Sequence, residues 1–263
     1  MKLKKFILII VIFALVLYEA FSLINKNDTI SSTSTAIVKI TIPEGYSNEQ
    51  IGQTLQKSGL VTEQDFINTV GNWTDNNYWF LDGLSNDKHK LDGFLYPATY
   101  SFPKNASSKT IIDAMLKTFN VNIQANKNYI IKNKLNIRHI VITGSLIEKE
   151  ASKDVDRPKI SSVIYNRLNK NMPLQIDATI LYVIGHKSKL YNKDLTVKSP
   201  YNTYLNKGLP PSPICNPGSK SINAAIYPAK TDYLYYVLNS ATDQHVFSKT
   251  YTDQTKNVAS YIK

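Results

Sequence analysis

The sequence is poor in cysteine and in acidic residues. A single cysteine, Cys215, stands among 263 residues, so no disulfide can form within the chain. This excludes a small disulfide-held scaffold but is compatible with any cellular compartment. Asp and Glu number 20 against 31 Lys and Arg, which gives a formal net charge of +11. Such an excess indicates an anionic neighbour, which could be nucleic acid, a membrane surface or an acidic polymer.

Several functional motifs are also missing. No long Lys/Arg run or nucleic-acid-binding signature accompanies the positive charge, so we expect no nucleic-acid partner. The chain has no GxSxG elbow and no Walker loop. Its four histidines do not have the spacing of metal ligands, and Cys215 lies in a segment without an evident activating partner. We therefore expect neither a metal nor a nucleotide cofactor.

The N-terminus combines positive charge with an apolar run. Lys2, Lys4 and Lys5 precede an apolar stretch at residues 6–18, which continues with two interruptions to residue 24. Charges on this side of the run fit the positive-inside rule, with the rest of the chain exported. The shorter stretch would suit a cleaved signal peptide, whereas 19 residues can span a bilayer. We expect a retained single-pass anchor over residues 1–24, with cleavage as the alternative.

A small α+β unit is predicted to follow a polar linker at residues 25–35. Residues 36–42 are rich in β-branched side chains and predict a strand. Ser47 and Gln50 have the spacing of a capping box, so a helix is expected to begin there. Gly59 would end that helix. The predicted unit covers residues 36–70.

The remainder predicts an α+β fold that is mostly helical. Residues 72–90 are rich in loop formers, and helices are expected from residue 107 or 108 to about 127 and at 137–151. A third helix should contain Pro158 in its first turn. Two short strands, joined by a polar turn, are expected near the C-terminus at residues 233–238 and 245–247.

Two carboxylates stand at the end of the predicted helix 137–151, in the stretch SLIEKEA. Carboxylates seldom lie against a core unless they are paired or take part in chemistry. On a helical wheel with about 100° per residue, Glu148 falls on the apolar face. Glu150, two residues later, lies roughly 200° around the helix from Glu148. A regular helix therefore cannot direct both into one pocket, and this wheel favours Glu148 as the buried one. Glu148 could alternatively form a structural ion pair with Arg157 or Arg167.

Three downstream strings carry further polar and aromatic groups: LQID at 174–177, SPYNTY at 199–204 and GLPP at 208–211. With SLIEKEA and the LDGFLYPATY stretch at 91–100, they resemble the YceG-like, or MltG-type, family of endolytic peptidoglycan transglycosylases. The resemblance runs from about residue 91 to about residue 258. Ala98 stands where this family often has an acidic residue, so we assign no catalytic role there.

The resemblance implies a fold and a location as well as an activity. It implies a LysM-like subdomain at residues 36–70, although a local cap without a ligand would explain that unit equally well. It further implies a lysozyme-like catalytic domain at 91–263, facing the outer side of the bacterial inner membrane. The implied substrate is the nascent peptidoglycan glycan strand, cut internally to leave 1,6-anhydro-N-acetylmuramic ends. Penicillin-binding proteins of the synthesis machinery are plausible partners.

The resemblance, unlike the helical wheel, favours Glu150 as the catalytic acid. One carboxyl group can protonate the leaving oxygen and then take a proton back, when the sugar's own 6-hydroxyl attacks in place of water. Asp177 could be a second carboxylate or simply the N-cap of a following helix. Polar groups of the loop at 201–204 could bind sugar or merely stabilise a turn. The predicted supporting residues are Glu148, Gln175, Asp177, Tyr201, Asn202, Thr203 and Tyr204.

Two rival functions remain open at this stage. A muramidase would use Glu150 with Asp177 to bring about hydrolysis. A wall-binding module without activity would use the tyrosines and the basic charge to hold glycan. The Glu-Lys-Glu stretch argues against the binding module, because binding alone needs no buried acid.

Overall fold

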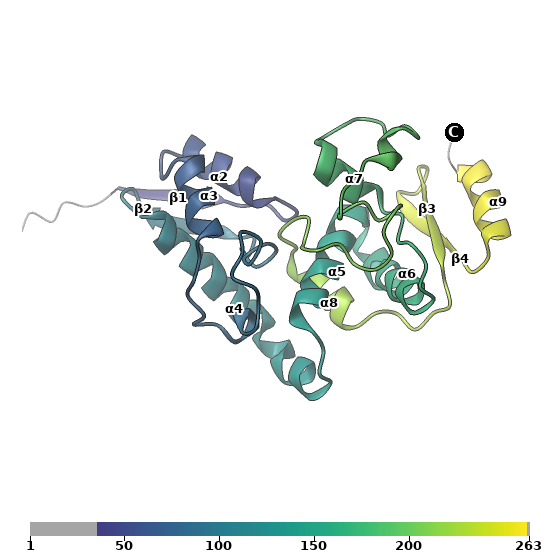
Figure 1. Ribbon diagram of the computed structural model, residues 1–263, viewed down its shortest axis with the longest axis horizontal. Helices are drawn as coiled ribbons and strands as arrows, with labels where there is room; N and C mark the ends of the chain where they lie inside the picture. The colour runs from purple at the N-terminus through teal and green to yellow at the C-terminus, as the bar shows by residue number, and fades with distance from the viewer. Residues whose placement is uncertain (1–35, 262–263) are drawn as a thin grey trace, which may run out of the picture. The chain divides into compact units, whose positions relative to one another are not determined.

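The computed structural model describes residues 36–261, and these form a mixed, helix-rich α+β structure with short strands near the C-terminus, as predicted (Figure 1). Within these residues, no helix is both long and apolar enough to cross a membrane. The predicted anchor at 1–24 and the linker at 25–35 lie outside the described residues and stay predictions.

The N-terminal unit consists of β1 (Ile37–Thr41), α2 (Asn48–Lys57) and α3 (Glu63–Gly71). Ser47 caps α2 and forms the predicted capping box with Gln50. Gly59 follows the helix with a φ of +74°, a conformation that suits glycine. Helix α3 is absent from the sequence prediction.

Strand β1 pairs with a strand that lies far along the chain. Its antiparallel partner is β2 (Thr99–Pro103), with Ile37 opposite Pro103 and Thr41 opposite Thr99. Strand β2 lies within the range 91–263 that the sequence analysis gave to the catalytic part. The small sheet therefore combines both predicted ranges, and the connection between its strands carries the 3-10 helix η1 (Trp79–Leu81).

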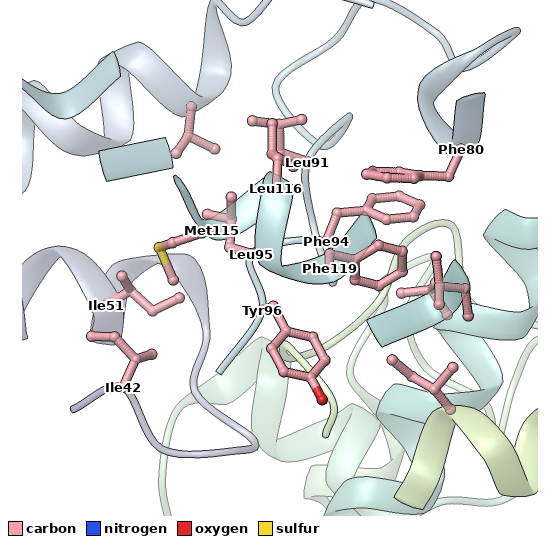
Figure 2. Packing of buried hydrophobic residues seen from close by; sticks show 14 of the residues in the cluster. Ile42, Ile51, Phe80, Leu91, Phe94, Leu95, Tyr96, Met115, Leu116 and Phe119 are labelled. Atoms are coloured by element: carbon pink, nitrogen blue, oxygen red, sulfur yellow. The ribbon is translucent and has the colours of Figure 1, made fainter. Parts of the chain in front are cut away.

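Aromatic side chains fill the core beside this sheet (Figure 2). The rings of Phe80, Phe94 and Phe119 contact one another with centroids 4.7 to 5.4 Å apart. Phe119 comes from α4 (Ser108–Lys132), which is five residues longer than predicted and is capped by Ser107. Phe80 and Phe94 come from the connection between the two strands, so these contacts hold that connection against α4.

The helical part is built around α5 (Ile137–Glu150), whose residues from Ile140 to Ile147 are all buried. Helix α8 (Ser219–Ile226) packs on it, with the backbone of Ile222 beside Gly144. The neighbouring α6 (Arg157–Asn169) has its proline in the first turn, as predicted. Helix α7 (Asp177–Ile184) also contacts α5. Two 3-10 helices, η2 (Asp154–Asp156) and η3 (Asp194–Thr196), lie in the connections.

The two C-terminal strands form the predicted hairpin. Strands β3 (Tyr235–Asn239) and β4 (Gln244–Ser248) pair in an antiparallel manner, with Tyr236 opposite Phe247. Helix α9 (Tyr251–Tyr261) contacts both strands (Figure 1). Hydrogen bonds from Arg167 of α6 to Leu234 and from Asn166 to Tyr233 hold the start of the hairpin on the helical part.

Candidate active site

Glu150 lies at the last position of α5, where the chain leaves the helix in an extended conformation at Ala151. The hydroxyl of Tyr236, from β3, donates a hydrogen bond of 2.9 Å to Glu150 Oε2. The first turn of α7, at Asp177 and Ala178, lies against the same carboxyl, and Asp177 lines the pocket with it. Three separate elements therefore surround the carboxyl group of Glu150, although the residue as a whole keeps some exposed surface.

This enclosure changes the acidity of Glu150. Burial raises its pKa from the ordinary value to about 7, and the negative charge of Asp177 adds to the rise. The hydrogen bond from Tyr236 and the nearby backbone of Ala178 act in the opposite direction, because both favour the charged carboxylate. A carboxyl group with a pKa near 7 can both give and accept a proton at neutral pH.

Glu148 faces a different set of partners. Its Oε2 accepts a 3.0 Å hydrogen bond from the backbone of Gly218, and its Oε1 lies 3.5 Å from Arg157. The side chain is only 8% exposed, so the wheel was right that Glu148 is buried. The helical wheel was wrong to place Glu150 on an exposed face, because the hairpin and α7 cover the side of α5 on which Glu150 lies. The two carboxylates do point to different places, as the helical geometry requires.

Asp177 does not cap α7. The N-cap position belongs to Ile176, and Asp177 is the first helical residue. Its carboxylate instead accepts a hydrogen bond from the hydroxyl of Tyr204. Burial and this contact with Asp177 raise the pKa of Tyr204, so its hydroxyl stays protonated and can donate. Asp177 and Tyr204 line the same pocket as Glu150.

Gln175 lies in the same pocket and adopts a φ of +53°. Its side-chain oxygen accepts a bond of 3.3 Å from Arg167. The guanidinium group of Arg167 also donates to the backbone oxygens of Pro173 and Leu174. Arg167 thereby fixes the segment that leads into α7, and with it the position of Asp177.

The four side chains of the loop at 201–204 have different partners, and most of them do not face Glu150. Asn202 is buried and accepts a 2.9 Å bond from the backbone of Tyr204, so it stabilises the turn. Thr203 is also buried and bonds to Ile176 and Thr179. The hydroxyl of Tyr201 hydrogen-bonds to Ser212, away from Glu150. Of the four predicted loop residues, only Tyr204 lines the Glu150 pocket.

The pocket around Glu150 has a volume of about 360 Å³, near the lower end of the range for ligand pockets. Sequence reasoning missed four of its polar residues, Lys149, Arg167, Tyr236 and His245. His245 is held by Asp156, which accepts from its backbone at 2.7 Å and contacts its ring at 3.1 Å. The only sequence feature that pointed to them was the tyrosine-rich segment at 233–236. The sequence did not show that this segment lies beside α5, more than 80 residues earlier.

The charged groups of the pocket suit acid–base chemistry on a polar ligand. Glu150 can hold a proton near neutral pH, and Asp177 supplies a second carboxylate nearby. Lys149 and Arg167 place positive charge at the same pocket. Across residues 36–261, no group of three or more His, Cys, Asp or Glu side chains has the arrangement of a metal site.

A family model described as the YceG-like family matches residues 17–260. The chain belongs to the YceG-like family. A crystal structure of a family member from Listeria monocytogenes superimposes with a TM-score of 0.74 at 40% identity, covering 84% of this chain and 76% of that one.

Two curated relatives in this family are named endolytic murein transglycosylase. The one from Bacillus subtilis is 41% identical over 235 residues, which are 85% of this chain and 65% of the relative. The one from Streptococcus pneumoniae is 32% identical over 260 residues, which are 91% of this chain and 47% of the relative. The chain thus spans between about half and two thirds of the length of these relatives.

Proposed function

We propose that this protein is an endolytic murein transglycosylase. It cleaves the bond between N-acetylmuramic acid and N-acetylglucosamine inside nascent peptidoglycan strands, and thereby ends strand elongation. The enclosed Glu150 carboxyl, with its pKa near 7 in an open pocket, supports this activity most strongly. Such a group matches the acid that glycosidic cleavage requires. The names of the relatives agree with the proposal.

Glu150 carries the chemistry in the proposed mechanism. Protonated Glu150 gives its proton to the glycosidic oxygen, and the C1–O bond breaks through an oxocarbenium-like transition state. The 6-hydroxyl of the same muramic acid then attacks C1, and the Glu150 carboxylate takes the hydroxyl proton. The product is a 1,6-anhydro ring, and the acid is restored. The negative charge of Asp177 would favour the positive transition state.

The remaining parts of the proposal concern location and partners. The helical part would be a lysozyme-like catalytic domain, and the unit at 36–70 a LysM-like one. An anchor at residues 1–24 would hold both on the outer side of the bacterial inner membrane. Penicillin-binding proteins that build the glycan are the expected partners, because nascent strands are found where they act.

The ends of the digested strands test the reaction type. Full-length protein should release 1,6-anhydro-N-acetylmuramic ends from purified glycan strands, with unchanged activity in EDTA, when products are analysed by mass spectrometry. Reducing ends that are heavier by one water would instead identify a muramidase in which Asp177 serves as the second carboxylate. Release of terminal disaccharides alone would contradict the endolytic part, and loss of activity on chelation would contradict the metal-free mechanism.

Tyr236 should set the pH dependence of this activity. Its hydroxyl bond to Glu150 stabilises the carboxylate, so removing it in Tyr236→Phe should raise the pKa of Glu150. The alkaline limb of the rate profile should then move to higher pH, because Glu150 stays protonated longer. We also expect about a tenfold loss of the limiting kcat, because the carboxylate that forms as the proton leaves loses one hydrogen bond to a charged group.

The neighbouring Tyr235 offers a matched control for this experiment. Its ring lies under the guanidinium of Arg167, 5.1 Å away, and it does not line the Glu150 pocket. Tyr235→Phe should leave the pH profile in place. If Tyr236→Phe leaves the limb unmoved, or moves it to lower pH, Tyr236 does not control the acidity of Glu150.

A further inference from the structure

A second pocket lies where the small N-terminal unit meets the helical part of the chain. One wall is formed by Asn48 and Glu49 of α2 and by Val70 and Gly71 of α3. The opposite wall includes His89, Tyr182 of α7 and residues just before Asn216. We call it the junction pocket. None of its lining residues belongs to the Glu150 pocket, and the mechanism above does not use it.

The two walls of the junction pocket are joined by backbone hydrogen bonds beside it. Gly45 donates to Asn216 at 2.9 Å, and Asn216 donates to Tyr46 at 2.8 Å. The side chain of Asn216 also donates to Asn48 at 3.0 Å and accepts from the backbone of Leu95 at 2.9 Å. These bonds fix the separation of the walls, so the pocket is a preformed feature of the molecule.

A buried carboxylate organises the polar side of the pocket. Asp92 is 9% exposed and accepts three hydrogen bonds of 2.8 Å, from Asn48, His89 and Ser212. Each of these donors is thereby held in one orientation. His89 remains partly exposed, with one ring nitrogen on Asp92 and the other free of that contact. The pocket therefore presents the fixed ring of His89 and the exposed carboxylate of Glu49 beside an apolar wall that includes Val70.

The junction pocket and the Glu150 pocket share their boundary elements. Asp177, at the first position of α7, lines the Glu150 pocket, and Tyr182 of the same helix lines the junction pocket. These positions are five residues apart, or about 7.5 Å along the helix axis and about 140° around it, so α7 lies between the two pockets. The 201–204 loop contacts a lining residue of each pocket. Tyr204 bonds to Asp177 of the Glu150 pocket, and the ring of Tyr201 lies 4.8 Å from that of Tyr182 in the junction pocket.

Lys149 links the Glu150 pocket to the segment of the small unit that precedes the junction pocket. It lines the Glu150 pocket, and its Nζ lies 3.5 Å from the backbone oxygen of Gly45 in the small unit. Ser47, two residues after Gly45, lines the junction pocket.

We propose that the junction pocket binds sugar units of the same glycan strand, at a distance from the bond that is cut. This inference rests on the proposed function, because an enzyme that cuts internal bonds must hold units on both sides of the bond. Sugars have apolar faces and hydroxyl edges, which match the apolar wall and the fixed polar groups of the pocket. The predicted consequence is a preference for longer strands over the shortest strand that can be cut.

Gly71→Leu tests the pocket by filling it. A Cβ at Gly71 would meet its nearest neighbour, the Cβ of Lys88, at 3.6 Å, an ordinary contact, so the variant should fold. The probe is peptide-free glycan strands, separated by length and digested by the full-length protein. The ratio of kcat/KM for long strands to that for the shortest cleaved strand should fall about tenfold, which corresponds to about 1.4 kcal/mol.

Two further variants make this result specific. Gln64→Leu adds the same side chain to an exposed position of α3 that does not line the pocket, and should leave the ratio unchanged. Glu49→Ala removes a polar group from the other wall and should lower the ratio about threefold, the effect of one modest hydrogen bond. An unchanged ratio in both Gly71→Leu and Glu49→Ala would overturn the proposal. So would an effect seen only with strands that carry peptides, because the occupant would then be a peptide.

Binding measurements separate this inference from the proposed function. Titration of long peptide-free strands into Glu150→Gln, with and without Gly71→Leu, reports on the pocket without any cleavage. Weaker binding in the double variant supports the pocket even if the wild-type protein forms no anhydro ends. Equal binding overturns the pocket even if the wild-type protein cleaves as proposed.

Discussion

Glu150→Gln should lower the rate of glycan cleavage by about 10²–10⁴-fold, the usual contribution of general acid–base catalysis. Glutamine keeps the shape of the side chain and can still accept the hydrogen bond from Tyr236, but it has no proton to give to the leaving oxygen. The rate of formation of 1,6-anhydro ends from purified strands measures the effect. A folded Glu150→Gln protein with wild-type activity would rule out Glu150 as the acid.

Glu148→Gln provides the comparison within the same helix. Glu148 is bound by Gly218 and Arg157, on the other side of α5 from Tyr236, so its replacement should spare most of the activity. Its main expected effect is lower stability, because the buried guanidinium of Arg157 loses one of its two charged partners and keeps only Asp154. A folded Glu148→Gln protein without activity would instead show that the helical wheel had identified the right acid.

An unfolding measurement shows whether Glu150→Gln is folded. The difference in stability between this variant and the wild type should also depend on pH. The pKa of Glu150 is about 7 in the folded protein, above its value of about 4.3 in an unfolded chain. Its contribution to stability is therefore complete below the unfolded value and is lost as pH rises through 7. Glutamine does not ionise, so the variant should gain stability relative to the wild type between pH 5 and pH 8.

The size of this gain follows from the shift in pKa. One pKa unit corresponds to about 1.4 kcal/mol of stability. Because the pocket opens to solvent, we expect a gain of about 2 kcal/mol rather than this value multiplied by the whole pKa shift. Denaturant unfolding of both proteins at pH 5 and pH 8 measures it. The same stability difference at both pH values would show that the Glu150 carboxyl is not destabilised by its surroundings.

Local signals in the sequence were sufficient for helices α2, α4, α5 and α6. The capping box at Ser47 and Gln50 and the proline in the first turn of α6 marked helix starts that the structure confirms. Helix α3 was missed, although Thr62 caps it by accepting from the backbone of Asp65. Its short stretch of nine residues carries only two buried side chains, which is too few for a clear helical period.

The surroundings of Glu150 could not be read from local patterns. The wheel assumed one buried face, whereas α5 is covered by α8 on one side and approached by Tyr236 on another. Tyr236 lies 86 positions from Glu150 in sequence, and no periodicity reports such a contact. The same limit applies to the tyrosines of the 201–204 loop. The turn fixed by Asn202 sends Tyr201 and Tyr204 to different partners, Ser212 and Asp177.

Gly93→Ala should destabilise the protein strongly, because Gly93 combines two constraints. Its φ is +80°, which costs a residue with a Cβ roughly 1–2 kcal/mol. A Cβ there would also lie 2.5 Å from Val141 and 2.7 Å from Pro213, both packed around the junction pocket and α5. Overpacking of this kind costs about 1–3 kcal/mol. Together we expect a loss of about 3 kcal/mol, or a Tm lower by about 6–12 °C.

Gly83→Ala separates the two constraints. Gly83 has a similar φ of +71°, but a Cβ there would meet no atom within 4 Å. It should therefore show only the backbone cost, about 1 kcal/mol, in thermal unfolding of the full chain. Equal losses in the two variants would mean that Val141 and Pro213 move aside at no cost, and that the neighbouring Asp92 is not held by tight packing. A larger loss in Gly93→Ala would place the network around Asp92 on a rigid base, which a binding pocket with fixed polar groups requires.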